Sequence, residues 1–159
     1  MAFNEQKISN VLNNFLQVQG YTDVKASFVS VSDSYYTIGA EYGEITLGGL
    51  TNPKADEIFM KYCKTLGLEV EVSIETLSFL HELGHHNTLD FLDPDEVAAS
   101  ELLKENLYMQ DEETEEAFMQ YFTCPEEMEA TVDAVEFCNH NPVIVKMLDK
   151  QLLNALYGE

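Results

Sequence analysis

The sequence predicts an α+β fold, in which a small sheet of three or four strands packs with several helices in one compact domain. Two patterns predict this fold. Apolar residues recur at helical spacing near the N-terminus and again beyond residue 53, whereas residues 24–50 alternate or form short apolar runs between turn residues. The 159 residues, 45% of them hydrophobic, suit a single domain over 1–159 with a buried core.

The N-terminal segment is expected to form a helix that stops by Gly20, because its apolar residues recur three and four positions apart. These residues are Ile8, Val11, Leu12, Phe15 and Leu16. Three strands are expected next, over 24–31, 35–40 and 44–50, with a turn at 32–34 and a tight hairpin connection at 41–44.

Four prolines punctuate the remainder of the chain, and each is expected to lie in the first turn of a helix. Asn or Asp precedes three of them and is a good helix cap, and acidic residues follow three of them and complement the positive end of the helix dipole. The predicted helices span 53–66, 73–87, 94–107, 113–122, 125–139 and 142–157, and a short strand is expected at 68–72.

The charge of the chain is strongly negative, with 8 basic residues, all Lys, against 29 acidic residues and a net charge of −21. Between Thr65 and Val145, 20 acidic residues accompany one basic residue, Lys104. Such a field repels nucleic acid, and without Arg the chain has no guanidinium for bidentate contacts to phosphate or guanine. We therefore expect no nucleic-acid partner. The charge would attract a basic partner, although solubility alone also explains it.

No stretch of the sequence approaches the apolar length of a membrane span, and the N-terminus lacks the pattern of a signal peptide. A cytoplasmic protein with no membrane partner is expected, or one released by lysis of its host cell. The three cysteines, Cys63, Cys124 and Cys138, are odd in number and show no C-x-x-C spacing. They are predicted to be buried or half-buried free thiols.

Five residues of the helix predicted over 73–87 form a metal-binding motif, His81-Glu82-Leu83-Gly84-His85, which has the form H-E-x-x-H. Residues four apart on a helix differ by roughly 40° of rotation and about 6 Å of rise, so both imidazoles project from one face and can hold one Zn²⁺. Glu82 then lies beside the metal as the candidate catalytic base. Gly84 costs roughly 1 kcal/mol relative to Ala inside a helix, which indicates close approach of another backbone or of substrate.

A catalytic zinc site needs a third protein ligand and one open position for water. The continuation H-E-x-x-H-x-x-G-x-x-H fails, because Thr88 and Phe91 stand where it requires Gly and His. Glu129 is the preferred third ligand, since Glu129 and Asp133 form an E-x-x-x-D pair on the helix that begins at Pro125. Asp133 is expected to accept a hydrogen bond from the second nitrogen of either histidine. The competing candidates for the third ligand are Glu126, Glu127, His140 and Asp90.

The pair of motifs, HELGH and E-x-x-x-D, resembles the Glu-zincins. The string Met128-Glu129-Ala130-Thr131-Val132-Asp133-Ala134-Val135 is similar to the ligand helix of the ImmA/IrrE-type metallopeptidases, compact intracellular or phage and mobile-element enzymes. This resemblance covers 35–50 and 73–137 at motif level and implies a zincin-like core. The 44 residues from His85 to Glu129 exceed what that family leads us to expect. We interpret the acidic segment from His86 to Thr123 as an insertion that forms a lid or a partner surface.

The resemblance implies a zinc-dependent metallopeptidase, a hydrolase that cleaves a peptide or protein substrate, and the charge favours a basic one. His81, His85 and Glu129 would hold Zn²⁺, and Glu82 would take the proton from its water and pass it to the leaving amine. Residues 35–50 would bind the substrate along an edge strand. The candidates for the oxyanion donor are Tyr121, His86 and Tyr42.

Two other classes of function remain open at this stage. The first is a non-enzymatic acidic binding protein that mimics the charge pattern of DNA and carries a relic or structural metal site. The net charge of −21 and the absence of Arg support this class of function. The second is a zinc-stabilised structural module, in which the metal supplies folding energy. A closed structural site usually includes cysteines, and none of the three is suitably spaced.

Overall fold

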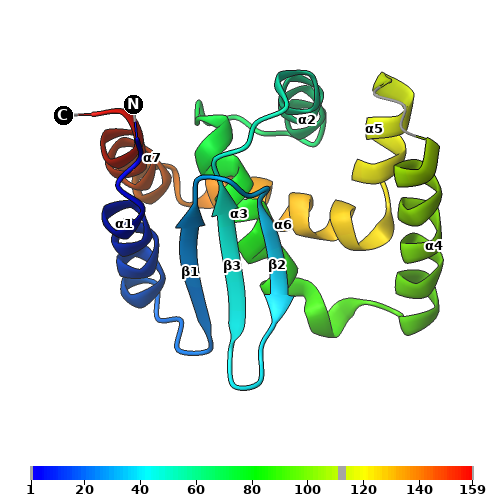
Figure 1. The fold of residues 1–159 in the computed structure, drawn as a ribbon, viewed down its shortest axis with the longest axis horizontal. Coiled ribbons are helices and arrows are strands. Elements are labelled where there is room, and N and C mark those ends of the chain that lie inside the picture. The colour runs from blue at the N-terminus through cyan, green and yellow to red at the C-terminus, as the bar shows by residue number, and fades with distance from the viewer. Residues whose placement is uncertain (1, 111–113, 159) are drawn as a thin grey trace.

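The computed structural model describes residues 2–110 and 114–158 and confirms the α+β fold, with seven α-helices and a three-stranded sheet in the described residues (Figure 1). In chain order the elements are α1 (Glu5–Val18), β1 (Val24–Val29), β2 (Tyr35–Ile38), β3 (Gly43–Gly48), α2 (Pro53–Thr65), α3 (Ile74–Thr88), a 3₁₀ turn (Leu89–Phe91), α4 (Pro94–Gln110), α5 (Glu115–Phe122), α6 (Pro125–His140) and α7 (Pro142–Tyr157).

The helices begin close to their predicted starts, and Pro stands at the first position of α2, α4, α6 and α7. The predicted start of one helix at residue 113 lies outside the described residues. The strand predicted at 68–72 is wrong. There the N–H of Leu68 donates to the carbonyl of Cys63 at 3.0 Å, and the N–H of Glu69 donates to Asn139 Oδ1 at 2.9 Å. These bonds close the end of α2 and tie it to α6, so the segment has no strand partner among the described residues.

The sheet has the strand order β1-β3-β2, with β1 parallel to β3 and β2 antiparallel to β3. The predicted alternation of β1 is confirmed, since Val24, Ala26 and Phe28 are buried and the residues between them are exposed. The hairpin lies two residues earlier than predicted, because Ile38 pairs with Gly43 and the N–H of Gly39 donates to the carbonyl of Tyr42.

Helix α1 covers the outer edge of β1. The Asn13 side chain donates to the carbonyl of Ala26 at 2.6 Å and accepts from the N–H of Ala26 at 2.9 Å. Ser9 Oγ accepts from the N–H of Phe28 at 2.9 Å. These side chains take the place of a fourth strand, so within the described chain β2 is the open edge of the sheet.

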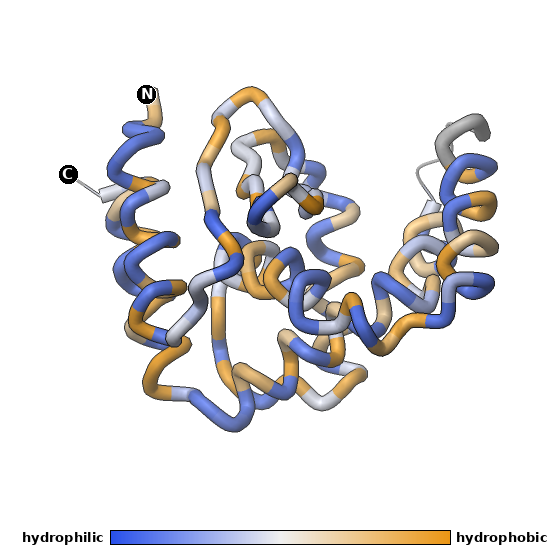
Figure 2. The backbone as a smooth tube through the Cα atoms, turned by 90° about the horizontal axis from the view of Figure 1, so that it is seen from below, coloured by the Kyte–Doolittle hydropathy of each residue, from blue (hydrophilic) through white to orange (hydrophobic). Residues whose placement is uncertain are grey.

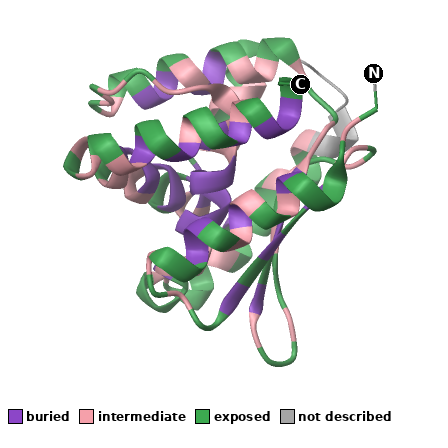
Figure 3. Ribbon diagram, turned by 90° about the vertical axis from the view of Figure 1, so that its left-hand side faces the viewer, coloured by how far each residue is buried: buried purple, intermediate pink, exposed green. Residues whose placement is uncertain are grey.

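The main core lies where α3 crosses behind the sheet, between α1 and α7 on one side and α6 on the other (Figures 1 and 3). Helices α4 and α5 stand apart from this core, beyond β2, and their polar and apolar residues are interspersed (Figure 2). Both described ends of the chain lie on the opposite side of the molecule. None of the helices in the described residues combines the length and apolar character needed to cross a membrane.

Gly84 allows α3 and α6 to approach each other closely. A Cβ at this position would run into the carbonyl oxygen of Ala130 and would lie 3.0 Å from the carbonyl carbon and the Cα of that residue. Close approach of another backbone, one of the two explanations suggested by the sequence, therefore accounts for a glycine inside this helix.

We expect Gly84→Ala to lower the free energy of unfolding by up to about 2 kcal/mol, because overpacking costs about 1–3 kcal/mol while Ala improves helix propensity by about 1 kcal/mol. Urea unfolding followed by circular dichroism measures the difference. The two effects have opposite signs, so a variant more stable than the parent by about 1 kcal/mol, the gain in helix propensity alone, would contradict the close packing of these two helices.

The three cysteines are free and buried, as predicted. Burial raises the pKa of Cys63 and of Cys138 to about 12. We expect the folded protein at about pH 8 to react with a thiol reagent orders of magnitude more slowly than the protein in denaturant, where all three thiols should react. Rapid labelling of Cys63 or Cys138 in the native protein, located by peptide mass spectrometry, would show that the helices holding these residues open readily.

Candidate metal centre

Helix α3 presents the motif and is fixed firmly at its start. Ser73 caps the helix, and its hydroxyl accepts from the N–H of Thr76 at 3.2 Å. Asp149 of α7 accepts from the hydroxyls of both Ser73 and Thr76, at 2.5 and 2.6 Å. The anchored helix carries His81 and His85 one turn apart, on the side that faces α6.

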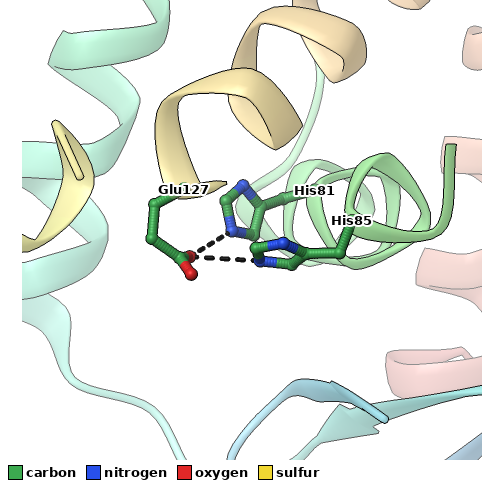
Figure 4. Close-up of side chains that lie close together, drawn as sticks. All are labelled: His81, His85 and Glu127. Atoms are coloured by element: carbon green, nitrogen blue, oxygen red, sulfur yellow. Dashed lines mark hydrogen bonds and ion pairs between the residues drawn. The ribbon is translucent and has the colours of Figure 1, made fainter. Parts of the chain in front are cut away.

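Glu127 of α6 meets both histidines (Figure 4). Its Oε1 lies 2.9 Å from His81 Nε2 and 3.2 Å from His85 Nε2. His81 and Glu127 are buried, with 8% and 4% of their surface exposed, and His85 is half-buried. One carboxylate oxygen and two imidazole nitrogens therefore converge on a single point inside the protein.

The preference for Glu129 as the third ligand is corrected by this geometry. Glu127 and Glu129 are two residues apart, which turns their side chains by roughly 200° around the helix. Glu127 shares the buried face of α6 with Ala130, Thr131 and Ala134, whereas Glu129 is exposed. That small-residue stripe is the signal in the sequence that selects Glu127 among the candidates, because it marks the face that packs against α3.

The role expected of Asp133 is also corrected. Asp133 accepts a hydrogen bond from Asn87 Nδ2 at 2.9 Å instead of from a histidine. The partner of His81 Nδ1 is the hydroxyl of Thr131, at 3.0 Å. Of the other candidates, Glu126 pairs with Lys104, and Asp90 and His140 are exposed.

Thr131 determines which nitrogen of His81 carries the proton. Its hydroxyl donates to the carbonyl of Glu127 at 2.8 Å, so its oxygen is left to accept from His81 Nδ1. A neutral His81 then has its lone pair on Nε2, the nitrogen that faces Glu127. Two lone pairs at 2.9 Å repel each other, so either an extra proton or a metal ion must lie between them.

The electrostatics of the cluster show the same need for positive charge. Burial by itself raises the pKa of Glu127, but the hydrogen bonds from His81 and His85 outweigh it and hold this pKa well below its usual range. Burial works to lower the pKa of His85, yet the hydrogen bond to Glu127 and the negative charge of that carboxylate raise it overall. The carboxylate thus stays ionised and favours a cation at the two nitrogens.

The cluster fits a divalent metal such as Zn²⁺. The three ligand atoms all lie within 4.8 Å of one another. Zinc binds imidazole nitrogen and carboxylate oxygen at about 2.0–2.2 Å, which in a tetrahedral site separates the ligand atoms by about 3.4 Å. The distances of 2.9 and 3.2 Å to Oε1 would need only a small outward movement to reach this value. Two imidazoles and one carboxylate are also a donor set found in catalytic zinc sites.

Glu82 lies next to the cluster on α3. It is buried, with 7% of its surface exposed, and it lines a cavity together with His85 and Glu127. Burial raises the pKa of Glu82, and the positive charge of the histidines works in the opposite direction. A carboxyl with a raised pKa beside a metal site is suited to accept and return a proton.

The cavity that opens over the cluster has a volume of about 840 Å³. Residues 34–38, which include β2, form one wall, and the start of α4 forms the other with Val97, Ala98 and Glu101. The candidate ligand atoms of His85 and Glu127 are therefore reached from a cavity whose wall is the open edge of the sheet. A closed four-ligand structural site would lack such access.

Strand β2 is fixed to α3 beside this cavity. Tyr36 stacks on the ring of His85, with centroids 6.4 Å apart and 22° between the planes. The Tyr36 hydroxyl lies 2.7 Å from His86 Nδ1, and His86 Nε2 lies 3.0 Å from Asp23 Oδ1. Because Asp23 can only accept, a neutral His86 accepts the hydrogen bond from Tyr36. Gly43 leaves room for this contact, since a Cβ there would meet Tyr36 and His86.

The three tyrosine and histidine candidates for an oxyanion donor lie in different places. Tyr121 lines the cavity beside Glu82 and Glu127. Tyr42 is in the hairpin, where Lys25 Nζ lies 4.3 Å from the centre of its ring, and it does not line this cavity. His86 is engaged by Tyr36 and Asp23, so Tyr121 is the candidate that the structure brings to the site.

Comparisons of the chain with models of protein families, with curated proteins and with solved structures gave no significant match. The function is therefore inferred from the chemistry of the site itself.

We expect Glu127→Gln to weaken Zn²⁺ binding by more than about 100-fold, because even residues that only support a metal ligand contribute about 10–100-fold. Competition with a chromophoric chelator measures the dissociation constant. Glu129→Gln is the matched control, since it removes the same charge from an exposed position of the same helix. Equal effects of the two substitutions would mean that net charge, and not ligation, determines metal affinity.

Proposed function

We propose that the protein is a zinc-dependent peptidase that hydrolyses a peptide bond in a peptide or protein substrate. One observation carries the proposal: two imidazole nitrogens and one carboxylate oxygen converge beside the buried Glu82, at a cavity walled by an open strand edge. The resemblance of HELGH to the zincin motif agrees with it. The part of that resemblance that depends on Glu129 does not contribute, because Glu129 is exposed.

His81, His85 and Glu127 would hold the metal, which when bound supplies a Lewis acid that polarises a carbonyl and lowers the pKa of water to about 7. Glu82 accepts a proton from the attacking water and returns it to the leaving amine. Glu82 is buried and lines the cavity beside His85 and Glu127, so it lies in position to hold that proton between the two transfers. Thr131 keeps the proton of His81 on Nδ1, so Nε2 remains available as a ligand.

Strand β2 is the proposed binding edge for the substrate. Its inner side pairs with β3, and its outer side faces the cavity, so an extended peptide can add to the sheet there. Tyr36 of this strand stacks on His85, which sets the bound peptide beside the metal ligands. The net charge of −21 favours a substrate with basic side chains. In the cavity wall, Glu101 is the acid that has no role in the metal site or in the pairing of Lys104.

We expect the parent and Glu82→Gln each to bind one Zn²⁺ per chain, and the variant to lose at least about 100-fold in turnover, because general acid–base groups contribute about 10²–10⁴-fold. Cleavage of a library of unstructured basic peptides, read by mass spectrometry, measures turnover, and metal analysis measures zinc. Glu136→Gln, on the exposed face of α6, is the control for loss of charge alone. Full activity of Glu82→Gln would exclude Glu82 as the base.

A further inference from the structure

Lys104 is the one basic side chain between Thr65 and Val145, and α4 places it at the metal centre. Its Nζ lies 2.6 Å from Glu127 Oε2 and 2.6 Å from Glu126 Oε1. The lysine side chain is 16% exposed, and the side chains of Glu126 and Glu127 are 17% and 5% exposed. The ammonium group also lies 5.0 Å from the centre of the Tyr121 ring.

The two oxygens of Glu127 therefore have different partners. Oε1 faces His81 and His85, and Oε2 faces Lys104. A carboxylate can ligate a metal through one oxygen or through both. A charge-assisted hydrogen bond from an ammonium group to one oxygen competes directly with ligation by that oxygen.

We propose that Lys104 is a positioning residue that restricts Glu127 to ligation through Oε1. This inference rests on the metal site of the proposed function and deepens it. A zinc site with two histidines and one monodentate carboxylate keeps its fourth position for water, whereas a second oxygen from Glu127 would compete for that position. The acidic segment 86–123 thus supplies a single Lys, and its ammonium group contacts Glu127, the one proposed ligand that does not come from α3.

Burial makes this contact difficult to replace. A half-buried ammonium is stable only when it is paired, and Lys104 has two carboxylates within hydrogen-bonding distance. Glu126 shares the charge of Lys104, so it holds the ammonium group beside Glu127 without facing the histidines itself. Glu127 therefore acts as the metal ligand, and Glu126 holds the ammonium group of Lys104 in position.

Cobalt substitution tests the proposal without a substrate. Co²⁺ in a four-coordinate site absorbs visible light more strongly than in a five-coordinate site, so its spectrum reports the coordination number. The parent protein, Lys104→Met and Lys104→Arg are each titrated with Co²⁺. Lys61→Met is the control, because Lys61 forms an exposed pair with Glu57 that does not line the cavity.

We expect one Co²⁺ per chain in all four proteins. The absorption per bound ion should fall severalfold in Lys104→Met and stay at the parental value in Lys104→Arg and Lys61→Met. A parental spectrum in Lys104→Met would overturn the role of Lys104 and leave the peptidase proposal standing. Failure of the parent to bind Co²⁺ or Zn²⁺ would overturn the metal site itself. Thermal unfolding of the metal-free variants checks folding, and Lys104→Ala carries the same test if Lys104→Met does not fold.

Discussion

One carboxylate oxygen organises the site. Oε1 of Glu127 faces two imidazole nitrogens in the protein interior, and such an arrangement is stable only if positive charge lies among the three groups. Two neighbouring residues affect where this positive charge can lie. Thr131 keeps one proton of His81 on the far side of the ring, and Lys104 neutralises the second oxygen of the carboxylate. The residues around the cluster thus leave one position for a cation, between Glu127 Oε1 and the two imidazole nitrogens.

The distance between the two helices that carry these groups is determined by backbone contact. Gly84 of α3 lies against the backbone of Ala130 in α6, and Ala134 continues the same face one turn later. Because no side chain separates the helices at Gly84, the Glu127 side chain is long enough to reach both histidines. Helices separated by larger side chains would require a longer reach and would hold the ligand atoms less rigidly. The glycine inside H-E-x-x-H is therefore part of the site, although it contributes no ligand.

Most of the fold was predictable from local sequence, but the carboxylate that joins the two histidines was not. Four helix starts follow from Pro in the first turn, which acts within a few residues, and two of them also have a side-chain cap, from Asn52 and Asp93. The strands follow from alternation and turns. The error at 68–72 arose because Leu68, Val70 and Val72 alternate with two glutamates, as in a strand. The segment is instead tied to α6 through Asn139, with no strand partner among the described residues. The choice of Glu129 over Glu127 followed an E-x-x-x-D pattern, whereas burial on α6 follows its small residues. The roles of Thr131 and Lys104 depend on contacts between segments that are distant in the sequence, and no local sequence pattern indicates such contacts.

The covered edge of β1 has a consequence for assembly. Asn13 and Ser9 occupy hydrogen-bonding groups that a neighbouring chain would otherwise use, so strand addition is confined to β2. A sheet that can grow on one side only cannot stack into an open fibre, because two copies joined at β2 have no further edge to offer. Self-association through that strand would therefore end at a pair, and the pair would hide the same edge from any peptide.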